Sequence, residues 1–450
     1  MKRKIYETLI KWKENSNGKT AVLIDGARRV GKSYIVEKFA KENYKSHITV
    51  DFNKVSDDVK SLFENYLNDL DTLFMYLSNY FNVKLYKRES LIVFDEVQLC
   101  PKARSAIKYL VEDGRYDYIE TGSLMSIKKN VSDIVIPSEE EHIEMYPMDF
   151  EEFLWALGNE TLTELIKKHF EERKPLEQAM HRKIMDYFRQ YMIVGGMPQA
   201  VNEYIETRDF NRVDKIKRNI LNLYRQDIGK HAEGYNLKVE SIFDEIPAQL
   251  QKHEKKFKLS SISKSARFRE YEDALFWLKD AMIMNPCYNS TDPNIGLKLN
   301  TDFMTLKCYM ADTGLLISHS FDENGIMSEE IYKKILFDKL EFNKGMIIEN
   351  IVAQMLVASG HKLYFYSKNS REDASNRMEI DFLIAKSKIS TRHNISPIEV
   401  KSSKRYTLTS LRKFIAKYKE QLHIPYVIHI ANLKEENGIV YLPIYMVSFL

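Results

Sequence analysis

The chain has 450 residues, of which 44% are hydrophobic and 29% charged, a composition typical of a folded protein with more than one core. Its formal net charge of +3 is too small to indicate a partner. Three cysteines without a C-x-x-C pair argue against a disulfide framework or a zinc site, and no apolar run approaches the roughly 18 residues that span a membrane. We therefore expect a cytoplasmic protein of several domains that has no membrane partner.

The first 150 residues alternate the patterns of strands and helices, which indicates a parallel sheet covered by helices. Strands are expected at residues 20–24, 47–52, 90–96 and 116–122. The third is the most apolar, as expected of a central strand that is buried on both faces. The fold class of this region is therefore predicted to be α/β.

Residues 26–33 (GARRVGKS) match the phosphate-binding pattern G-x-x-x-x-G-K-[ST] at every fixed position. They lie between a predicted strand and a predicted helix, so backbone N–H groups and the helix dipole point at one place. Lys32 adds a full positive charge, and the Ser33 hydroxyl suits a Mg²⁺ ion that bridges phosphates. We therefore expect ATP or GTP to bind at Gly26, Ala27, Arg28, Arg29, Val30, Gly31, Lys32 and Ser33. For the two arginines, solvation is an equally good alternative.

The strand at residues 90–96 ends in Asp95 and Glu96, which places both carboxylates at the edge of the sheet beside the phosphate loop. Asp95 would hold Mg²⁺, and Glu96 would polarise the water that attacks the terminal phosphate. The second acid favours hydrolysis over passive storage of the nucleotide, with Lys32 and Glu96 as catalytic residues. Thr121 follows on the next strand, where it either contacts the γ-phosphate or its water, or belongs to an ordinary turn.

Beyond residue 150 the pattern becomes helical, with helices expected in residues 176–206 and 211–230. Residues 195–198 (GGMP) interrupt the first range as a turn and a plausible hinge. The range 151–235 is therefore predicted to be a helical lid or linker.

The next range, residues 236–325, reads as helices followed by a hairpin. The helices are expected at residues 241–251, 260–264 and 269–280, and the hairpin turn at residues 289–294. This is the order of elements in a winged helix-turn-helix, and the region is predicted to be winged-helix-like.

Acidic residues on two predicted strands near the C-terminus form a second candidate site. Side chains alternate between the faces of a strand, so Glu399 and Lys401 share one face, and Asp381 lies opposite the apolar face of its own strand. If the strands pair, Asp381 and Glu399 converge, and Glu349 on a preceding helix adds a third carboxylate. Such ligands suit Mg²⁺ or Mn²⁺, and Lys401 would position water or stabilise developing charge. The alternative is a solvated strand face with salt bridges of little energetic value.

Several segments together resemble a large prokaryotic family of AAA-type ATPases of the archaeal-ATPase kind. They are GARRVGKS, LIVFDE, the T-G-S turn at 121–123, MYPMDFEEF at 145–153, GGMP at 195–198 and YMADTGL at 309–315. The resemblance covers essentially the whole chain. Many relatives carry Gly-Arg before the Tyr-Pro segment, whereas residues 136–141 here are IPSEEE, so we assign no arginine finger.

The resemblance implies an ATP-hydrolysing N-terminal domain and a C-terminal half that is a domain of unknown function with a nuclease-like fold. The C-terminal carboxylates also look like the PD-(D/E)XK nuclease site, with Asp381, Glu399 and Lys401 as catalytic residues and Glu349, Asp381 and Glu399 as metal ligands. The domains are then a P-loop AAA-type ATPase domain (1–150), a helical lid (151–235), a winged-helix-like region (236–325) and a PD-(D/E)XK nuclease-like domain (326–450).

Positive charge is concentrated in two parts of the C-terminal half. Residues 386–420 contain ten Lys or Arg and two Glu, a net charge of +8, and residues 251–270 contain seven Lys or Arg and two Glu, a net of +5. Such clusters release counterions from phosphates and bind nucleic acid without reading its sequence. DNA is therefore the expected partner, and a solvated basic surface is the alternative.

The leading hypothesis is an ATP hydrolase whose C-terminal half binds DNA and cuts it with Mg²⁺ or Mn²⁺. One alternative is a nucleotide-dependent switch or assembly module whose inactive nuclease-like domain docks a protein partner. Another is a sequence-specific regulator that uses the winged-helix-like region. Homo-oligomer formation is left open.

Overall fold

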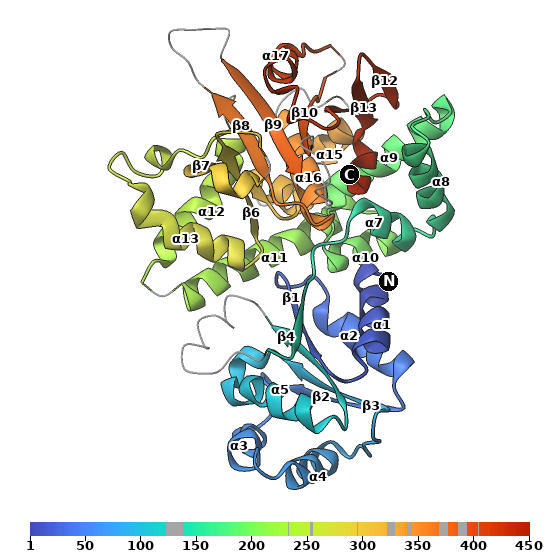
Figure 1. Cartoon of the computed structure of the whole chain (residues 1–450), viewed down its shortest axis with the longest axis vertical. Helices are drawn as coiled ribbons and strands as arrows, with labels where there is room; N and C mark the ends of the chain where they lie inside the picture. The colour runs from blue at the N-terminus through green and yellow to red at the C-terminus, as the bar shows by residue number, and fades with distance from the viewer. Residues whose placement is uncertain are drawn as a thin grey trace. The chain divides into compact units, whose positions relative to one another are not determined.

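The computed structural model describes residues 1–122, 138–232, 234–252, 255–294, 296–321, 329–337, 339, 344–368, 377–385, 394–403 and 405–450. Of the residues singled out above, those outside the described ranges are Ser123, Ile136, Pro137, residues 253–254, residues 386–393 and Lys404. The chain divides into two compact units (Figure 1). Unit 1 comprises Met1–Tyr146 with Asp280–Met282, and unit 2 comprises Pro147–Lys279 with Ile283–Leu450. In the described part of the chain, no helix is long and apolar enough to cross a membrane.

Unit 1 contains a five-stranded sheet in the order β2-β3-β4-β1-β5, and every neighbouring pair is parallel. The strands are β1 (Ala21–Asp25), β2 (Ser46–Asp51), β3 (Ser90–Asp95), β4 (Asp117–Gly122) and β5 (Glu140–Glu144). The predicted parallel α/β sheet is therefore confirmed, and β1 to β4 agree with the predicted strands to within one residue at each end. The sequence pattern missed β5, because this edge strand is half exposed and largely acidic, without the apolar run of a buried strand.

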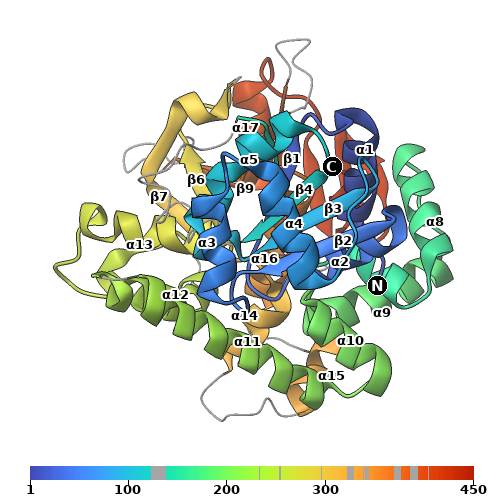
Figure 2. The same cartoon turned by 90° about the horizontal axis from the view of Figure 1, so that it is seen from below.

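Helices pack beside this sheet. They are α1 (Lys4–Ser16), α2 (Lys32–Asn43), α3 (Asp57–Asn65), α4 (Leu70–Phe81) and α5 (Pro101–Asp113), with a 3-10 turn η1 (Val97–Leu99). Helices α3, α4 and α5 gather at β2 and β4 (Figure 2). Phe52, Phe63 and Phe94 interlock there in a buried aromatic cluster, with ring centroids 5.3–5.8 Å apart. This packing fixes the carboxyl ends of β2 and β3, where Asp51 and Asp95 lie side by side.

Unit 2 combines helices with an eight-stranded sheet in the order β12-β13-β11-β10-β9-β8-β6-β7. The strands are β6 (Met284–Ser290), β7 (Thr301–Met310), β8 (Tyr364–Lys368), β9 (Met378–Ala385), β10 (Ile395–Val400), β11 (Tyr426–His429), β12 (Lys434–Glu436) and β13 (Ile439–Pro443). The helices are α7 (Phe150–Ala156), α8 (Glu160–Glu171), α9 (Gln178–Val194), α10 (Pro198–Thr207), α11 (Phe210–His231), α12 (Asn236–Gln251), α13 (Phe268–Asp280), α14 (Thr313–Ser320), α15 (Glu329–Leu336), α16 (Lys344–Ala358) and α17 (Thr409–Tyr418). Short 3-10 helices are η2 (Leu259–Ser261), η3 (Leu297–Asn300) and η6 (Ile444–Phe449).

The segment α16-β8-β9-β10-α17-β11 carries the predicted second site. Strands β8, β9 and β10 form an antiparallel meander (Figure 1). Strand β11 then pairs parallel with β10 after α17. A parallel neighbour needs a crossover connection, and here α17 (Thr409–Tyr418) lies within it. Helix α16 is apolar almost all round and buried over most of its length, which explains why its sequence shows little amphipathic character.

The region predicted to be winged-helix-like contains α12, η2, α13 and the antiparallel hairpin β6–β7, in the predicted order. The predicted middle helix at residues 260–264 is only the 3-10 turn η2. Strand β6 also pairs parallel with β8, with Tyr288 opposite Tyr364. The hairpin thus belongs to the same sheet as the later strands, and the sheet spans the predicted boundary at residue 325.

The GGMP turn, expected as a hinge, is held tightly within unit 2. Asp312 caps α14 and accepts hydrogen bonds from the backbone N–H groups of Gly196 (2.5 Å) and Leu315 (2.8 Å). The backbone of Gly196 also pairs with Met148, and a Cβ atom at Gly196 would lie 2.1 Å from the Met148 carbonyl oxygen. Glycine is therefore required here for close approach of two backbones. The three motifs at 145–153, 195–198 and 309–315 meet at this point.

Candidate functional site

The phosphate loop connects the end of β1 to the start of α2, as its sequence predicts. Gly31 has φ 96° and caps α2, and Arg29 has φ 72°, so two residues of the loop take left-handed conformations. Gly26 is constrained by space, because a Cβ atom there would lie 2.4 Å from the Met145 carbonyl oxygen. The loop thereby turns sharply and presents the helix N-terminus, which is the arrangement that cradles phosphate. Arg28 and Arg29 have exposed side chains.

Lys32 lies across this loop. Its Nζ donates hydrogen bonds to the carbonyl oxygens of Gly26 (2.7 Å) and Ala27 (3.2 Å). Burial lowers the pKa of Lys32, while the negative charges of Glu96, Asp25 and Asp95 oppose this shift. Its ammonium group is therefore held by backbone oxygens that an incoming phosphate can replace.

Asp95 accepts hydrogen bonds from two of the other predicted residues around the loop, Ser33 and Thr121. The Ser33 hydroxyl donates to Oδ1 of Asp95 at 3.0 Å, and the Thr121 hydroxyl donates to the same oxygen. The three residues come from the start of α2 and the ends of β3 and β4, which are neighbouring strands. The parallel sheet thus brings together residues that are 62 and 26 positions apart in the chain.

Glu96 follows directly and has φ 55°, a left-handed conformation that is uncommon for a residue with a side chain. The Gln98 side chain donates to Oε2 of Glu96 and orients its carboxylate. Such backbone strain tends to occur where a side chain must take a particular direction for function.

An open hollow of about 520 Å³ adjoins Ser33 and Asp95. Its other lining residues are Tyr34, Glu37, Thr49, Asp51, Lys54, Val55, Tyr80 and Phe81. Sequence reasoning missed this lining, although β2 ends in Asp51 as β3 ends in Asp95. The parallel register that pairs these two acids was the signal that could have identified Asp51.

A histidine that the sequence did not single out lies behind the loop. Nε2 of His142, on β5, is 3.1 Å from Oδ2 of Asp25, which is fully buried at the end of β1. The hydrogen bond to Asp25 raises the pKa of His142, although burial opposes this. His142 is thus placed to neutralise the buried acid that precedes the phosphate loop.

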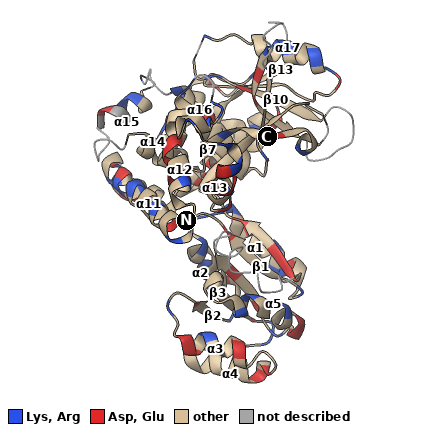
Figure 3. Ribbon diagram, turned by 90° about the vertical axis from the view of Figure 1, so that its left-hand side faces the viewer, with Lys and Arg blue, Asp and Glu red and all other residues tan. Residues whose placement is uncertain are grey.

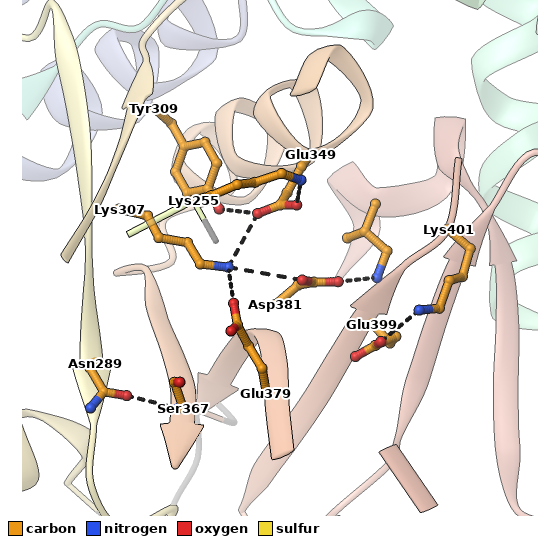
Figure 4. Close-up of polar contacts among 11 residues, drawn as sticks. Lys255, Asn289, Lys307, Tyr309, Glu349, Ser367, Glu379, Asp381, Glu399 and Lys401 are labelled. Carbon is orange, nitrogen blue, oxygen red and sulfur yellow. Dashed lines mark hydrogen bonds and ion pairs between the residues drawn. The ribbon is translucent and has the colours of Figure 1, made fainter. Parts of the chain in front are cut away.

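In unit 2, two of the predicted carboxylates, Glu349 and Asp381, surround a lysine together with Glu379, which the sequence did not single out (Figure 4). Nζ of Lys307, on β7, lies 3.3 Å from Oε1 of Glu349, 3.1 Å from Oε1 of Glu379 and 3.9 Å from Oδ1 of Asp381. The side chain of Lys307 is only 1% exposed. Burial lowers the pKa of Lys307, but the three carboxylates outweigh this effect and raise it. The ammonium group therefore stays charged in a buried position.

Glu349 has two further partners. The ammonium group of Lys255 pairs with its Oε2, and the Tyr309 hydroxyl donates to its Oε1. Burial raises the pKa of Glu349, but the charges of Lys255 and Lys307 outweigh it and hold the pKa at about 2. This carboxylate is fully compensated by groups of the chain itself.

Glu399 lies beside this group on β10. Lys401 donates to its Oε1 at 2.6 Å, as their shared strand face predicts. The backbone N–H of Val400 donates to Oδ2 of Asp381 at 2.7 Å, and β9 and β10 pair antiparallel with Ile398 opposite Phe382. Burial, together with the charge of Asp381, raises the pKa of Glu399 to about 8.

These donors do not fit a divalent ion as they stand. Glu349 and Asp381 face the ammonium group of Lys307, and Glu399 faces that of Lys401. Within the described ranges, no group of three or more His, Cys, Asp and Glu residues is placed to hold a metal ion. The strands bring the predicted residues together, and lysines of the chain occupy the space between them.

Basic residues also gather on α17 (Figure 3). An open hollow of about 650 Å³ in unit 2 is lined by Tyr406, Thr407, Leu408, Thr409, Arg412, Lys413, Lys434 and Tyr441. In the other predicted basic segment, Lys255 points inward to Glu349, whereas Lys252, Lys258, Lys264, Arg267 and Arg269 are exposed.

Comparisons with known families divide the chain into three parts. Residues 18–154 match the model of an AAA domain. Residues 185–324 match a domain of unknown function, DUF8612, and residues 344–447 match another, DUF4143. No curated protein is similar enough in sequence to count as a match.

Solved structures show a weak, extended likeness. A Walker-type ATPase of Pyrococcus abyssi is 16% identical, with a TM-score of 0.40 over 70% of this chain and 94% of that one. The Aeropyrum pernix Orc1 protein, in complex with DNA, is 11% identical, with a TM-score of 0.29 over 72% of this chain and 93% of that one. Drosophila ORC, bound to DNA, is 13% identical, with a TM-score of 0.27 over 68% and 91%. Values this low assign neither an activity nor a partner to this chain.

Proposed function

We propose that the P-loop AAA-type ATPase domain at residues 18–154 hydrolyses ATP, and that hydrolysis controls the action of unit 2 on DNA. The observation that carries the first part is the convergence of the Ser33 and Thr121 hydroxyls on Asp95, next to Lys32 and Glu96. Hydroxyl and carboxylate oxygens at the start of a phosphate-binding helix suit Mg²⁺, which would supply positive charge to neutralise the phosphates.

Each residue has a distinct role in this proposal. The loop N–H groups and Lys32 bind the phosphates, with Lys32 exchanging the Gly26 and Ala27 carbonyl oxygens for phosphate oxygens. Ser33 and Asp95 would hold Mg²⁺. Glu96 orients the attacking water and accepts its proton, a role that its fixed carboxylate direction supports.

The test of hydrolysis is steady-state ATP turnover by the full chain. Lys32→Ala is expected to abolish turnover and to leave the fold intact, as judged by circular dichroism. Unchanged turnover in this variant would end the proposal. Measuring turnover with and without single- and double-stranded DNA tests the coupling, which predicts a change in rate when DNA is added.

The DNA partner is supported by the charge of α17 and its surroundings. Arg412, Lys413 and Lys434 line one open hollow with Tyr406 and Tyr441, so cations and aromatic rings occur together. Backbone contacts by such groups give binding that weakens steeply with salt. Binding of a labelled duplex at increasing salt concentration tests this, and an affinity that does not change with salt would contradict it.

Cleavage of DNA is the part of the sequence hypothesis with least support. It assigns Asp381 and Glu399 to Mg²⁺ or Mn²⁺ and Lys401 to the attacking water. The ion pairs of Lys255 and Lys307 instead favour the second candidate, a nucleotide-dependent switch whose nuclease-like unit docks a partner without cutting. Incubating plasmid and linear DNA with the protein and either ion separates them, because only the first predicts cuts, which Asp381→Ala should abolish.

A further inference from the structure

Acidic and basic side chains in the buried cluster of unit 2 nearly balance (Figure 4). The carboxylates are those of Glu349, Glu379, Asp381 and Glu399, and the ammonium groups are those of Lys255, Lys307 and Lys401. With all four carboxylates ionised, the formal charges sum to −1. A divalent ion would bring this sum to +1 and would have to share the carboxylates with three cations.

We propose that Lys307 takes the place of a divalent cation in unit 2, so that the carboxylate cluster is complete within the chain and binds neither Mg²⁺ nor Mn²⁺. Its ammonium group lies 3.1–3.9 Å from carboxylates on α16 and at two positions of β9. An ammonium group has three N–H donors, and here three carboxylates surround it. This arrangement gives Lys307 the partners that a metal ion would otherwise have.

The position of Lys307 leaves it little freedom to move aside. It lies within β7, paired with Cys287 on β6, and its neighbours Leu306 and Cys308 are buried. Its Nζ also lies 5.0 Å from the centroid of the Phe365 ring. A metal ion in the cluster would lie within a few ångströms of this buried ammonium group, where like charges repel strongly. Entry of the ion therefore requires displacement of a lysine that the sheet holds in place.

The cluster also joins two segments of the chain that match different families. Lys255, Lys307 and Tyr309 belong to residues 185–324, whereas Glu349, Glu379 and Asp381 belong to residues 344–447. The inner ion pairs thus run from one segment to the other. The cluster acts as an ionic cross-brace within unit 2, which is a structural role rather than a catalytic one.

The test is Mn²⁺ binding to the nucleotide-free full chain, followed by electron paramagnetic resonance. The proposal predicts equal Mn²⁺ stoichiometry for the unmodified protein and Asp381→Asn. Lys307→Met should gain one Mn²⁺ per chain, and the double variant with Asp381→Asn should lose it again. Any weak site in unit 1 is common to all these proteins and cancels in the comparison.

Two results would overturn the proposal. One is an Mn²⁺ ion bound by the unmodified protein and lost in Asp381→Asn. The other is a folded Lys307→Met variant that gains no ion. If Lys307→Met does not fold, the unmodified protein compared with Asp381→Asn and Glu399→Gln decides alone. The inference rests on the second candidate function, in which unit 2 docks a partner without cutting DNA. Failure of ATP hydrolysis would appear in the Lys32→Ala assay and would leave the Mn²⁺ stoichiometries unchanged.

Discussion

The phosphate loop of unit 1 and the carboxylate cluster of unit 2 use the same residue types in opposite ways. In unit 1, Lys32 contacts backbone carbonyl oxygens, Asp95 accepts from two hydroxyls, and the Ser33 side chain is exposed beside an open hollow. In unit 2, the carboxylates contact ammonium groups directly, and Lys307 is sealed from solvent.

The comparison shows that the presence of Asp, Glu and Lys at strand ends does not by itself identify a catalytic site. Opposite charges that already pair in a buried place have little to offer a ligand, because removing either partner leaves an uncompensated charge. Neutral partners such as carbonyls and hydroxyls are easier to exchange for phosphate or Mg²⁺. Whether the charged side chains contact neutral groups or opposite charges therefore distinguishes the two sites better than their sequence motifs do.

The strongest expected contrast is in catalysis. Glu96→Gln keeps the shape of the side chain but removes the base, so ATP turnover should fall by about 10²–10⁴-fold while nucleotide binding is retained. Steady-state turnover and binding of a fluorescent ATP analogue measure the two effects. Glu89→Gln, on the exposed pair with Lys45, is the matched control and should change turnover little. Equal activity of both variants would remove Glu96 from the mechanism.

The next contrast concerns stability. Lys307→Met removes a buried cation from the buried Glu349 and the half-buried Glu379 and Asp381, and should destabilise unit 2 by about 3–5 kcal/mol. Lys434→Met, which breaks an exposed pair with Glu436, should cost less than about 1 kcal/mol. Denaturant unfolding compares the two variants. A cost at Lys307 as small as that at Lys434 would contradict the description of the cluster as a completed ionic structure.

Within the cluster, Glu349 and Glu399 should respond to pH in opposite directions. The pKa of Glu399 is raised from 4.5 to about 8, so the folded state binds this proton more tightly and its contribution to stability falls as pH rises from 4.5 to 8. Glu399→Gln should remove this fall, a change on the order of 5 kcal/mol in unfolding free energy, since each pKa unit corresponds to about 1.4 kcal/mol.

Glu349 is the internal control for that measurement. Its pKa is held at about 2, so its stabilising contribution is present above 4.5 and lost as pH falls toward 2. Glu349→Gln should therefore be most destabilising at neutral pH. Parallel pH profiles for the two variants would show that the cluster does not distinguish its carboxylates.

The smallest expected effect concerns the role of the Thr121 hydroxyl in unit 1. Thr121→Val removes one of the hydroxyl donors to Asp95, worth about 1 kcal/mol, so turnover should fall by roughly five- to tenfold. A loss as large as that of Glu96→Gln would instead mean that Thr121 contacts the phosphate or its water. Turnover at saturating ATP measures the difference.

Local patterns predicted unit 1 well because its signals are short in sequence. The phosphate loop needs eight consecutive residues, and each apolar run forms one buried strand, so β1 to β4 and the loop between β1 and α2 followed directly, whereas the AAA domain was expected from the family resemblance. Thr121 and Ser33 were placed near Asp95 for the right reason, since parallel strands end at one edge. His142 was missed because its partner, Asp25, lies on another strand.

The cluster of unit 2 was only half predictable. Strand periodicity correctly placed Glu399 with Lys401, and the pairing of β9 with β10 brought Asp381 close. The residues around Lys307 in the sequence do not predict its contact with the carboxylates, because that contact depends on β6 and β7 joining the sheet beside β8. Lys255 read as part of a basic surface and instead points inward. The DNA partner, the domain boundaries and the cytoplasmic location stay predictions.

The cross-brace also has a practical consequence for dissecting the chain. A fragment beginning at residue 326 would keep Glu349, Glu379 and Asp381 but lose Lys255, Lys307 and Tyr309, together with the strands β6 and β7. The carboxylates would then lack their cations. The edge of β8 and the apolar helix α16 would also lose the strands that cover them. Such a fragment is expected to aggregate when expressed alone, whereas supplying residues 147–325 alongside it should restore a folded unit.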